Sequence, residues 1–343
     1  MIWMMLFLWN PGEEAVPLIS LNKSWNWNLS EHEIYRSRMF AVSDDGTVVV
    51  LDRDKNRAVR ISPDGKTASQ LGTNGEGPGE LSAPGEITWS RKEQVFVILD
   101  AGRRASKWDN NGVFVAEYRF NGNGRSPRMV GNKKMILARA QFGMNGGTPG
   151  LVQVRLGKDK AKEILNYVPD KPTTFTNAGN EANPLRIAFR WDPRLMFSTG
   201  SDFIAYAFGG EPTLHIIDFK GKQLVGPIAV RIQRFEVSDD QLEEGTLLMP
   251  NDWHAGIRKG LVRPEAWPYF REIHVDEKDR IWMVGSSRNV KSSHPYLLYS
   301  RTGKKLGRGY VRKSPLVISG DAMYYFDDEG EDLHLEKATL QFK

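Results

Sequence analysis

The sequence between Leu71 and Phe120 reads LGTNGEGPGELSAPGEITWSRKEQVFVILDAGRRASKWDNNGVFVAEYRF. After a Gly-rich approach it contains four short apolar segments: Glu86–Ser90, Val95–Leu99, Ala105–Asp109 and Val113–Phe120. The residues between these segments are polar or turn-prone. Strands of this length joined by such turns form an antiparallel meander. We therefore predict a single four-stranded sheet from this stretch.

The same order of strands and turns occurs upstream. Val48–Asp52 (VVVLD) aligns with Phe96–Asp100 (FVILD), and Asp64-Gly65 aligns with Asn111-Gly112 roughly 47 residues later. A repeat of this length with four strands is typical of one blade of a β-propeller. The two copies therefore predict blades one and two.

Looser copies follow along the rest of the chain. They are centred on residues 135–158, 195–221, 272–303 and 316–341, and the last copy has only about three strands. We assign Val16–Leu21 to complete it and close the ring, because an open edge leaves backbone groups unsatisfied. The predicted fold is an all-β, six-bladed β-propeller of four-stranded antiparallel blades, with five or seven blades as alternatives. Residues 16–343 would form one domain and residues 1–15 an N-terminal extension.

The repeat resembles a known family. The residues that carry the resemblance are Pro78-Gly79-Glu80-Leu81, then VFVILD, then a polar loop with Arg and a turn Gly. They are similar to the NHL-type repeats of six-bladed propellers. The resemblance is clear over residues 38–120, fair over 265–310 and weak elsewhere. It implies the fold rather than one activity, because the family includes lyases, relatives of lactonases and plain binding modules.

Composition narrows the function classes and the location. The chain has 47 Lys and Arg against 42 Asp and Glu, without a run of like charges, so we expect no nucleic-acid partner. Cys is absent, so disulfides and thiolate metal sites are excluded. The first nine residues, MIWMMLFLW, are too short to span a bilayer but resemble the apolar region of a signal peptide. They lack a basic start and a small-x-small cleavage site, so an apolar strand is the alternative. We expect a monomer without a transmembrane span, outside the cytoplasm, with a cytoplasmic location as the alternative.

Propeller ligands usually bind where the inner strands begin, at the mouth of the central channel. The aligned blades place the following residues there: Arg38 or Met39, Glu86, Arg128, Arg194, Arg271 with Glu272, and Arg312 or Lys313. Converging guanidinium groups favour an anionic ligand, because their forks match carboxylate and phosphate. The alternative is that these side chains extend to solvent or pair with acidic loop residues.

A long connection over residues 235–268 interrupts the repeats. Ser238 followed by acidic residues predicts a capped helix there, and Trp253 and His254 are the connection's candidate ligand-binding residues. His215 and His274 lie within strand patterns, and we interpret them as packed or surface residues. Trp267 is a possible sugar platform, although aromatic residues more often fill the space between blades.

The leading functional prediction is a non-catalytic propeller that recognises a protein, a peptide or a small anionic ligand at the channel mouth. It needs no cofactor, although a divalent cation such as Ca²⁺ is possible. The alternative is a metal-dependent, lactonase-like hydrolase or an NHL-type lyase, in which Glu86 would be one metal ligand. No G-x-S-x-G, HExxH or nucleotide-binding fingerprint is present. Asp52-x-Asp54-x-Asn56 looks like the start of a calcium loop but lacks the later Gly and Glu, so we interpret it as a polar turn.

Overall fold

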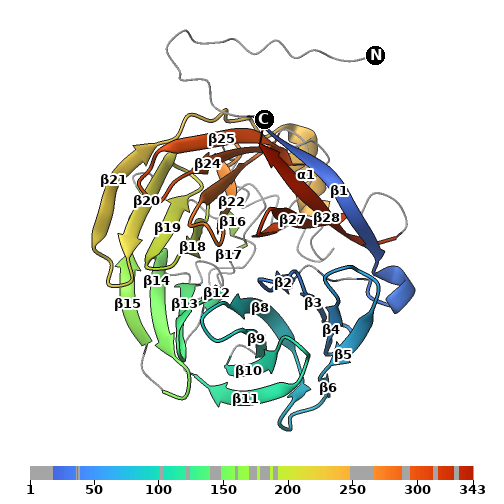
Figure 1. Ribbon diagram of the computed structural model, residues 1–343. Helices are drawn as coiled ribbons and strands as arrows, with labels where there is room; N and C mark the ends of the chain where they lie inside the picture. Colours follow the sequence, from blue (N-terminus) through green and yellow to red (C-terminus); the bar gives the residue numbers. More distant parts are fainter. Residues whose placement is uncertain are drawn as a thin grey trace, which may run out of the picture.

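The computed structural model describes residues 18–35, 37, 39–100, 103–120, 124–139, 148–158, 161–169, 176–177, 186–187, 192–247, 264, 266–287, 294–311, 316–327 and 332–342. These residues form six antiparallel blades around a central axis (Figure 1). The predicted six-bladed β-propeller is therefore confirmed.

Each blade contains four strands, and the first lies innermost. Blade one contains β2 (Phe40–Val42), β3 (Val48–Asp52), β4 (Arg57–Ile61) and β5 (Ala68–Leu71). Blade two contains β8 (Pro84–Ser90), β9 (Val95–Asp100), β10 (Arg104–Asp109) and β11 (Phe114–Arg119). Blade three contains β12 (Gly124–Gly131), β13 (Lys134–Arg139), β14 (Gly150–Arg155) and β15 (Ala161–Asn166).

The second half of the ring follows the same order. Blade four contains β18 (Leu195–Thr199), β19 (Phe203–Phe208), β20 (Thr213–Asp218) and β21 (Gln223–Ala229). Blade five contains β22 (Phe270–Val275), β23 (Ile281–Gly285), β24 (His294–Tyr299) and β25 (Lys305–Val311). Blade six contains β26 (Leu316–Ser319), β27 (Ala322–Asp327), β28 (His334–Phe342) and β1 (Leu18–Asn28).

The ring is closed at two levels. The first strand of every blade contacts the first strands of both neighbouring blades, so β2, β8, β12, β18, β22 and β26 form a complete circle. At the outside, β1 pairs antiparallel with β28, and its first residues pair parallel with β25 (Figure 1). The predicted closing strand is therefore confirmed, but it is longer than expected and continues to Asn28.

The core lies between the blades. Six hydrophobic clusters each combine residues of two adjacent blades. Strand β3 shows the reason: Val48 and Val50 pack toward blade six, whereas Val49 and Leu51 pack toward blade two. Successive side chains of a strand point to opposite faces, so a strand between two neighbours must be apolar at every position. This explains the uninterrupted sequences VVVL and VFVIL.

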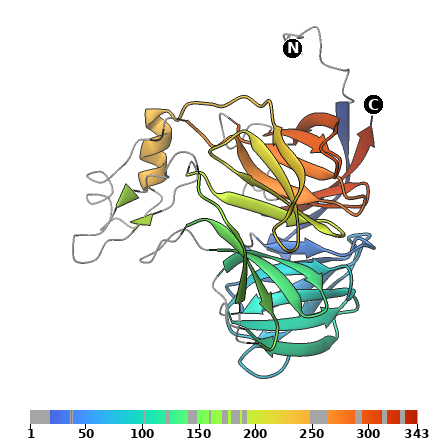
Figure 2. The ribbon, with the colours of Figure 1, turned by 90° about the vertical axis from the view of Figure 1, so that its left-hand side faces the viewer.

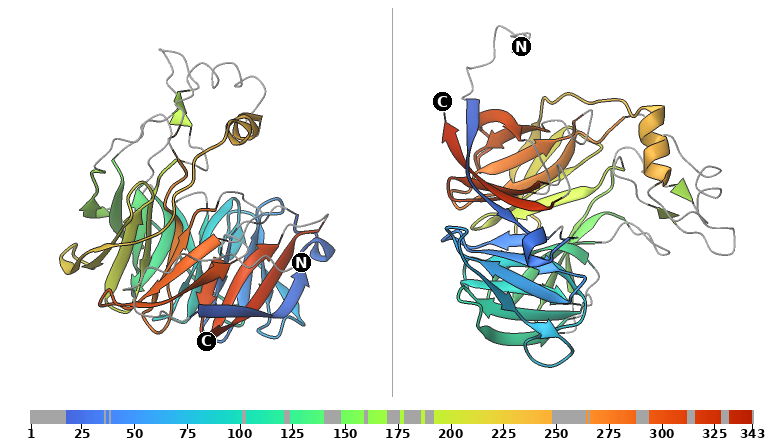
Figure 3. Two further views of the ribbon diagram at one scale, coloured as in Figure 1. Left: turned by 90° about the horizontal axis from the view of Figure 1, so that it is seen from above. Right: turned by 90° about the vertical axis from the view of Figure 1, so that its right-hand side faces the viewer.

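Among the described residues, two pairs of short strands and two helices lie between the blades or beside them. Between blades one and two, β6 (Thr73–Asn74) pairs with β7 (Glu80–Leu81), and after β1 comes the short 3-10 helix η1 (Ser30–His32). The pair β16 (Thr176–Asn177) and β17 (Arg186–Ile187) projects from one face of the ring together with helix α1 (Asp239–Leu247) (Figures 2 and 3). No helix among the described residues has the length and apolarity that crossing a membrane requires.

Candidate functional site

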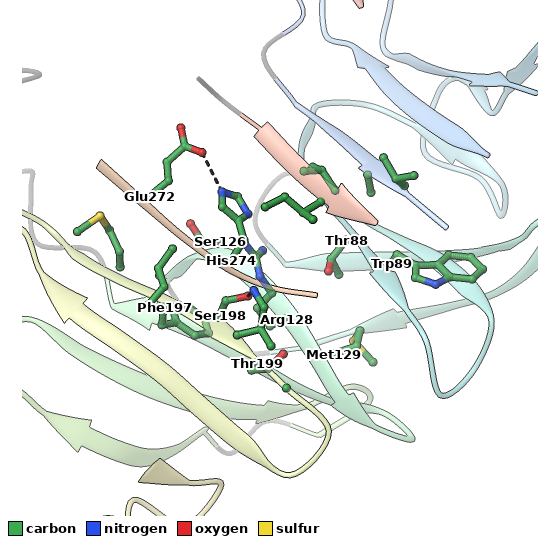
Figure 4. A pocket seen from close by; sticks show the side chains of 18 of the residues that line it. Thr88, Trp89, Ser126, Arg128, Met129, Phe197, Ser198, Thr199, Glu272 and His274 are labelled. Atoms are coloured by element: carbon green, nitrogen blue, oxygen red, sulfur yellow. Dashed lines mark hydrogen bonds and ion pairs between the residues drawn. The ribbon is translucent and has the colours of Figure 1, made fainter. Parts of the chain in front are cut away.

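A cavity of about 880 Å³ follows the axis of the propeller, and the first strands form its wall. This volume suits a small organic ligand. Figure 4 shows side chains from β8, β12, β18 and β22 around the same space. Five of the residues predicted from the sequence line this cavity: Glu86, Arg128, Arg194, Arg271 and Glu272. The structure thus brings them together, and their role in ligand binding stays a prediction.

Backbone irregularities occur at the start of three inner strands. In β8 the pairing shifts between Pro84 and Glu86, and in β22 it shifts between Phe270 and Glu272. In β12, Arg125 and Arg128 are three residues apart, but their partners on β13, Ala138 and Ile136, are only two residues apart. Ser126, which lies between the two arginines, has a φ of 56°. A β-bulge re-aims the side chains around it. The bulges therefore determine how the predicted ligand-binding residues are presented to the channel.

The bulge in β12 has a specific effect on charge. In a regular strand, residues three positions apart face opposite sides of the sheet. Arg125 is paired with Ala138 and Arg128 with Ile136, two positions apart on β13, so both arginines lie on the same face of blade three. Two guanidinium groups are thereby gathered on one side of the mouth.

Glu86 and Arg128 are perturbed by their place in the channel wall. Burial raises the pKa of the Glu86 carboxyl, although Arg128, the backbone N–H of Ser126, Arg125 and Arg53 act in the opposite direction. Because burial dominates, Glu86 holds its proton to a higher pH than an exposed glutamate.

Arg128 contributes both a charge and a fixed position. Its Nη1 donates to the carbonyl oxygen of Pro127 at 2.9 Å. Burial lowers the pKa of its guanidinium group, while the charges of Glu86 and Glu272 act in the opposite direction. Arg128 thus lies under the influence of carboxyl groups from blades two and five.

The starts of β18 and β22 are held together through Gly209. Its N–H donates to the carbonyl oxygen of Arg194 at 2.9 Å, and its carbonyl accepts from the N–H of Tyr269 at 2.7 Å. A Cβ at position 209 would lie 3.1 Å from Pro268 and 3.2 Å from the Phe270 carbonyl, so the close approach favours glycine. This contact fixes Arg194 relative to Arg271, which follows directly after Phe270.

His274 is a channel residue that the sequence interpretation missed. It lines the cavity, and its Nε2 lies 2.9 Å from Oε2 of Glu272 (Figure 4). The structure therefore adds His274 to the residues that line the channel, and its interpretation as a packed or surface residue rather than a ligand stays a prediction. The signal was present, because residues two apart on a strand share a face and Glu272 was already placed at the channel. His215, by contrast, is packed as expected, stacked on Tyr206 at 4.7 Å between ring centroids.

Five of the predicted residues lie outside the described residues: Arg38, Trp253, His254, Arg312 and its alternative Lys313. The helix expected after Ser238 is confirmed as α1. The Ser238 side chain accepts from the Gln241 N–H, and Oε1 of Gln241 accepts from the Ser238 N–H, which forms a capping box. Oε1 of Gln241 also accepts from Nε1 of Trp267 at 3.1 Å, and Trp267 is only 1% exposed. Trp267 therefore anchors the helix and offers no open sugar platform.

Two observations concern metal binding. Within the described ranges, no group of three or more His, Asp or Glu side chains is arranged to hold a metal ion, so these residues do not supply a complete ligand set around Glu86. Asp52 is buried, and its carboxylate accepts from Nε of Arg57 at 2.8 Å and from the Lys55 N–H at 3.3 Å. The Asp52–Asn56 stretch is thus a polar turn of the repeat, as interpreted from the sequence.

No family model and no curated protein matches this sequence. Among solved structures, the chain is similar to a member of the DUF4221 family from Bacteroides vulgatus, with a TM-score of 0.57 and 11% identity over 95% of this chain and 99% of the other. It is also similar to a putative exported protein from Bacteroides fragilis, with a TM-score of 0.52 and 11% identity over 96% of each chain. A virginiamycin B lyase from Staphylococcus aureus matches at a TM-score of 0.46 and 13% identity over 94% of this chain and 99% of the other. At these identities the similarity concerns the fold alone.

Proposed function

We propose that this propeller is a binding module that holds a small anionic ligand, or the carboxylate of a peptide or protein partner, in its central channel. One observation carries the proposal: guanidinium groups from three consecutive blades, those of Arg128, Arg194 and Arg271, line one cavity of about 880 Å³. Guanidinium groups bind carboxylates and phosphates through charge-assisted hydrogen bonds. A concave site of this size favours a ligand group that enters the channel over a flat contact.

Calorimetric titration with benzoate and with benzamide tests this proposal. The two compounds have similar shape, but only benzoate is charged, so we expect benzoate to bind at least tenfold more tightly. Arg271→Gln should weaken benzoate binding about tenfold, the size of one lost charge-assisted hydrogen bond. Arg119→Gln is the matched control, because Arg119 is exposed on the outer strand β11. Equal binding of benzoate and benzamide would contradict the proposal.

One observation favours the enzymatic alternative, a hydrolase or lyase working in the same channel. His274 is hydrogen-bonded to Glu272, and a carboxylate-supported imidazole is a typical general base. Glu86 lines the same cavity, and burial raises its pKa, as suits a proton donor. Proton transfer to and from a bound ligand would need such a pair of groups.

A screen of lactones and aryl esters, combined with His274→Ala, tests this alternative. Turnover by the unmodified protein that falls at least 100-fold in His274→Ala, with benzoate binding retained, would establish the enzyme. Absence of turnover across the screen would favour the binding module. Elemental analysis and melting curves with Ca²⁺, Mg²⁺, Mn²⁺ and EDTA would show whether a metal takes part.

We further propose that the protein functions outside the cytoplasm. The support is the apolar sequence MIWMMLFLW, which resembles the apolar region of a signal peptide, together with the structural similarity to a protein described as exported. Alkaline phosphatase fused after Lys343, which is active only outside the cytoplasm, should be active in bacteria and lose its activity when residues 1–15 are deleted. Equal activity with and without these residues would contradict export by this segment.

A further inference from the structure

Arg128 leaves most of its hydrogen-bonding capacity unused at the end of the channel where the inner strands begin, which we call the first mouth. Its Nη1 donates to the carbonyl oxygen of Pro127 at 2.9 Å, and this is its only hydrogen bond with the described part of the chain. A guanidinium group has five N–H donors in a planar fork. The side chain lines the cavity and extends into it (Figure 4). Its remaining donors are therefore available to a ligand with acceptor oxygens.

Glu86 lies beside Arg128 without forming an ion pair with it. Its carboxyl group accepts from the N–H of Ser126, which lies two residues before Arg128 on β12. The charges of Glu86 and of Glu272 from blade five both act on Arg128. Neither carboxyl group forms an ion pair with Arg128 within the described ranges. Because all three residues line the cavity, a ligand group can enter between opposite charges that are not in contact.

The negative charge of Glu86 is not fully compensated by the arginines around it. Burial raises the pKa of its carboxyl group, although Arg128, Arg125 and Arg53 act in the opposite direction. A buried carboxylate is stabilised by an opposite charge close to it and by hydrogen bonds from charged donors. A cationic ligand group at Glu86 would supply both. The first mouth thus favours a ligand that carries a positive group as well as a negative one.

The opposite end of the cavity is charged as well, but most of its groups are already engaged. Four charged residues line this end, after the ends of β8 and β22: Arg91, Lys92, Glu277 and Asp279. Arg91 pairs with Asp44 at 3.3 Å and with Glu277 at 3.5 Å, and Asp279 accepts from the N–H of Ser201 at 2.9 Å. The seven residues of β8 separate the two ends by about 20 Å, so a small ligand reaches only one of them.

We propose that the ligand is an α-amino acid, with its carboxylate at Arg128 and its ammonium group at Glu86. This inference rests on the proposed anion-binding function and specifies that the anion carries a positive group on the adjacent carbon. The carboxylate accepts hydrogen bonds from the Arg128 fork, and the ammonium group donates to the Glu86 carboxylate. The zwitterion thereby places each of its charges beside an opposite one. The cavity of about 880 Å³ has room for its side chain.

Calorimetric titration of the full chain with three aromatic compounds at pH 7.5 tests the inference. L-Phenylalanine carries both charges, 3-phenylpropanoate lacks the ammonium group, and 2-phenylethylamine lacks the carboxylate. We expect phenylalanine to bind at least tenfold more tightly than either of the other two, because one additional charge-assisted hydrogen bond changes the affinity by about this factor or more.

Two variants assign the two charged groups of the ligand. Glu86→Gln should bring the preference for phenylalanine over 3-phenylpropanoate toward one. Glu76→Gln is the matched control, because Glu76 is exposed in a loop, and it should keep the preference. Arg128→Gln should weaken both compounds at least tenfold. Arg128→Lys keeps the charge and loses the fork, so it should weaken both by less, and it serves if the glutamine variant does not fold.

The outcomes separate this inference from the proposed function. Equal binding of phenylalanine and 3-phenylpropanoate to the unmodified protein would overturn the amino-acid inference and leave the anion site in place. An unchanged preference in Glu86→Gln would likewise overturn it. Tightest binding of 2-phenylethylamine would overturn both proposals. If none of the three compounds binds and benzoate does not bind either, the proposed function fails as well.

Discussion

His294 lies at the start of β24 with 1% of its surface exposed, and its Nδ1 is 3.2 Å from the carbonyl oxygen of Gly285. Burial, together with the nearby positive charge of Arg271, lowers its pKa to about 4, although the Gly285 carbonyl and Glu272 act in the opposite direction. Between pH 6.5 and 4, His294 is therefore protonated in the unfolded chain but neutral in the folded protein. The free energy of unfolding must fall as the pH falls through this range.

We expect His294→Leu to reduce this acid sensitivity. The unmodified protein should lose about 2 kcal/mol between pH 7 and pH 4.5 through this residue, and the variant should not. Urea unfolding at the two pH values measures the difference, which is independent of any constant cost of the substitution. Equal pH dependence in the unmodified protein and in His294→Leu would disprove this role.

Single residues also show how far the site could be predicted. Glu86, Arg128 and Arg271 were found because a repeated blade assigns an equivalent position in each copy, and they do line the channel. His274 was missed because a histidine in an apolar strand pattern is ambiguous until its neighbours in space are known. The contact between Gly209 and Tyr269 joins segments more than fifty residues apart in the sequence, so no local sequence pattern indicates it.

At the scale of elements, the turn after the second strand of blade two anchors the first strand. Asp100 ends β9 and is completely buried. Its carboxylate accepts from the backbone N–H groups of Ser82, at 2.8 Å, and Ala83, and it pairs with Arg104. Ser82 and Ala83 immediately precede β8, which carries Glu86. In blade two the Leu-Asp of the repeat thus fixes the strand that carries a channel residue, whereas Asp52 of blade one accepts from Lys55 and Arg57 within its own turn.

Asp100→Ala should destabilise the protein by about 2–4 kcal/mol, because it leaves the backbone N–H groups of Ser82 and Ala83 without their acceptor, whereas Arg104 keeps the carbonyl oxygens of Glu76 and Glu80. Asp54→Ala should change stability by less than about 0.5 kcal/mol, since Asp54 is exposed in the equivalent loop of blade one. Urea unfolding of both variants gives the comparison. A loss below 1 kcal/mol in Asp100→Ala would show that the turn does not depend on this carboxylate.

The strands themselves were largely predictable, and their irregularities were not. Apolar runs between turn residues located β3, β9 and β19 because strands buried on both faces leave no other pattern. The bulge in β12 shifts Arg125 and Arg128 to one face, yet residues 125–128 read as an ordinary polar stretch. A bulge depends on how two strands pair, and the sequence of one strand alone does not indicate that pairing.

At the scale of the whole molecule, the ring is held shut by noncovalent contacts between the two ends of the described chain. β1 lies between β25 and β28, so blades five and six form one continuous eight-stranded sheet. Nζ of Lys23 pairs with Glu336, and Oγ of Ser24 lies 2.6 Å from Oγ1 of Thr339. We call the pairing of β1 with β28 the seam. Any opening of the ring at the seam must break these contacts.

A disulfide at the seam should stabilise the whole protein. Because the chain contains no other cysteine, Ser24→Cys combined with Thr339→Cys can form only this intramolecular bond. We expect a gain of about 2–4 kcal/mol, since the bond would restrict a very large loop of the unfolded chain. Melting curves with and without reductant measure it. An unchanged melting temperature after confirmed oxidation would contradict the expected stabilisation.

The seam also has a consequence for synthesis. Lys23 and Glu336, which meet in blade six, are separated by 313 positions in the sequence. The ribosome therefore makes β1 long before its partner β28, and in the interval five blades can fold locally while β1 waits with an unpaired edge. The circle can be completed only after β28 has been synthesised, and until then a chaperone that shields exposed strands would matter most.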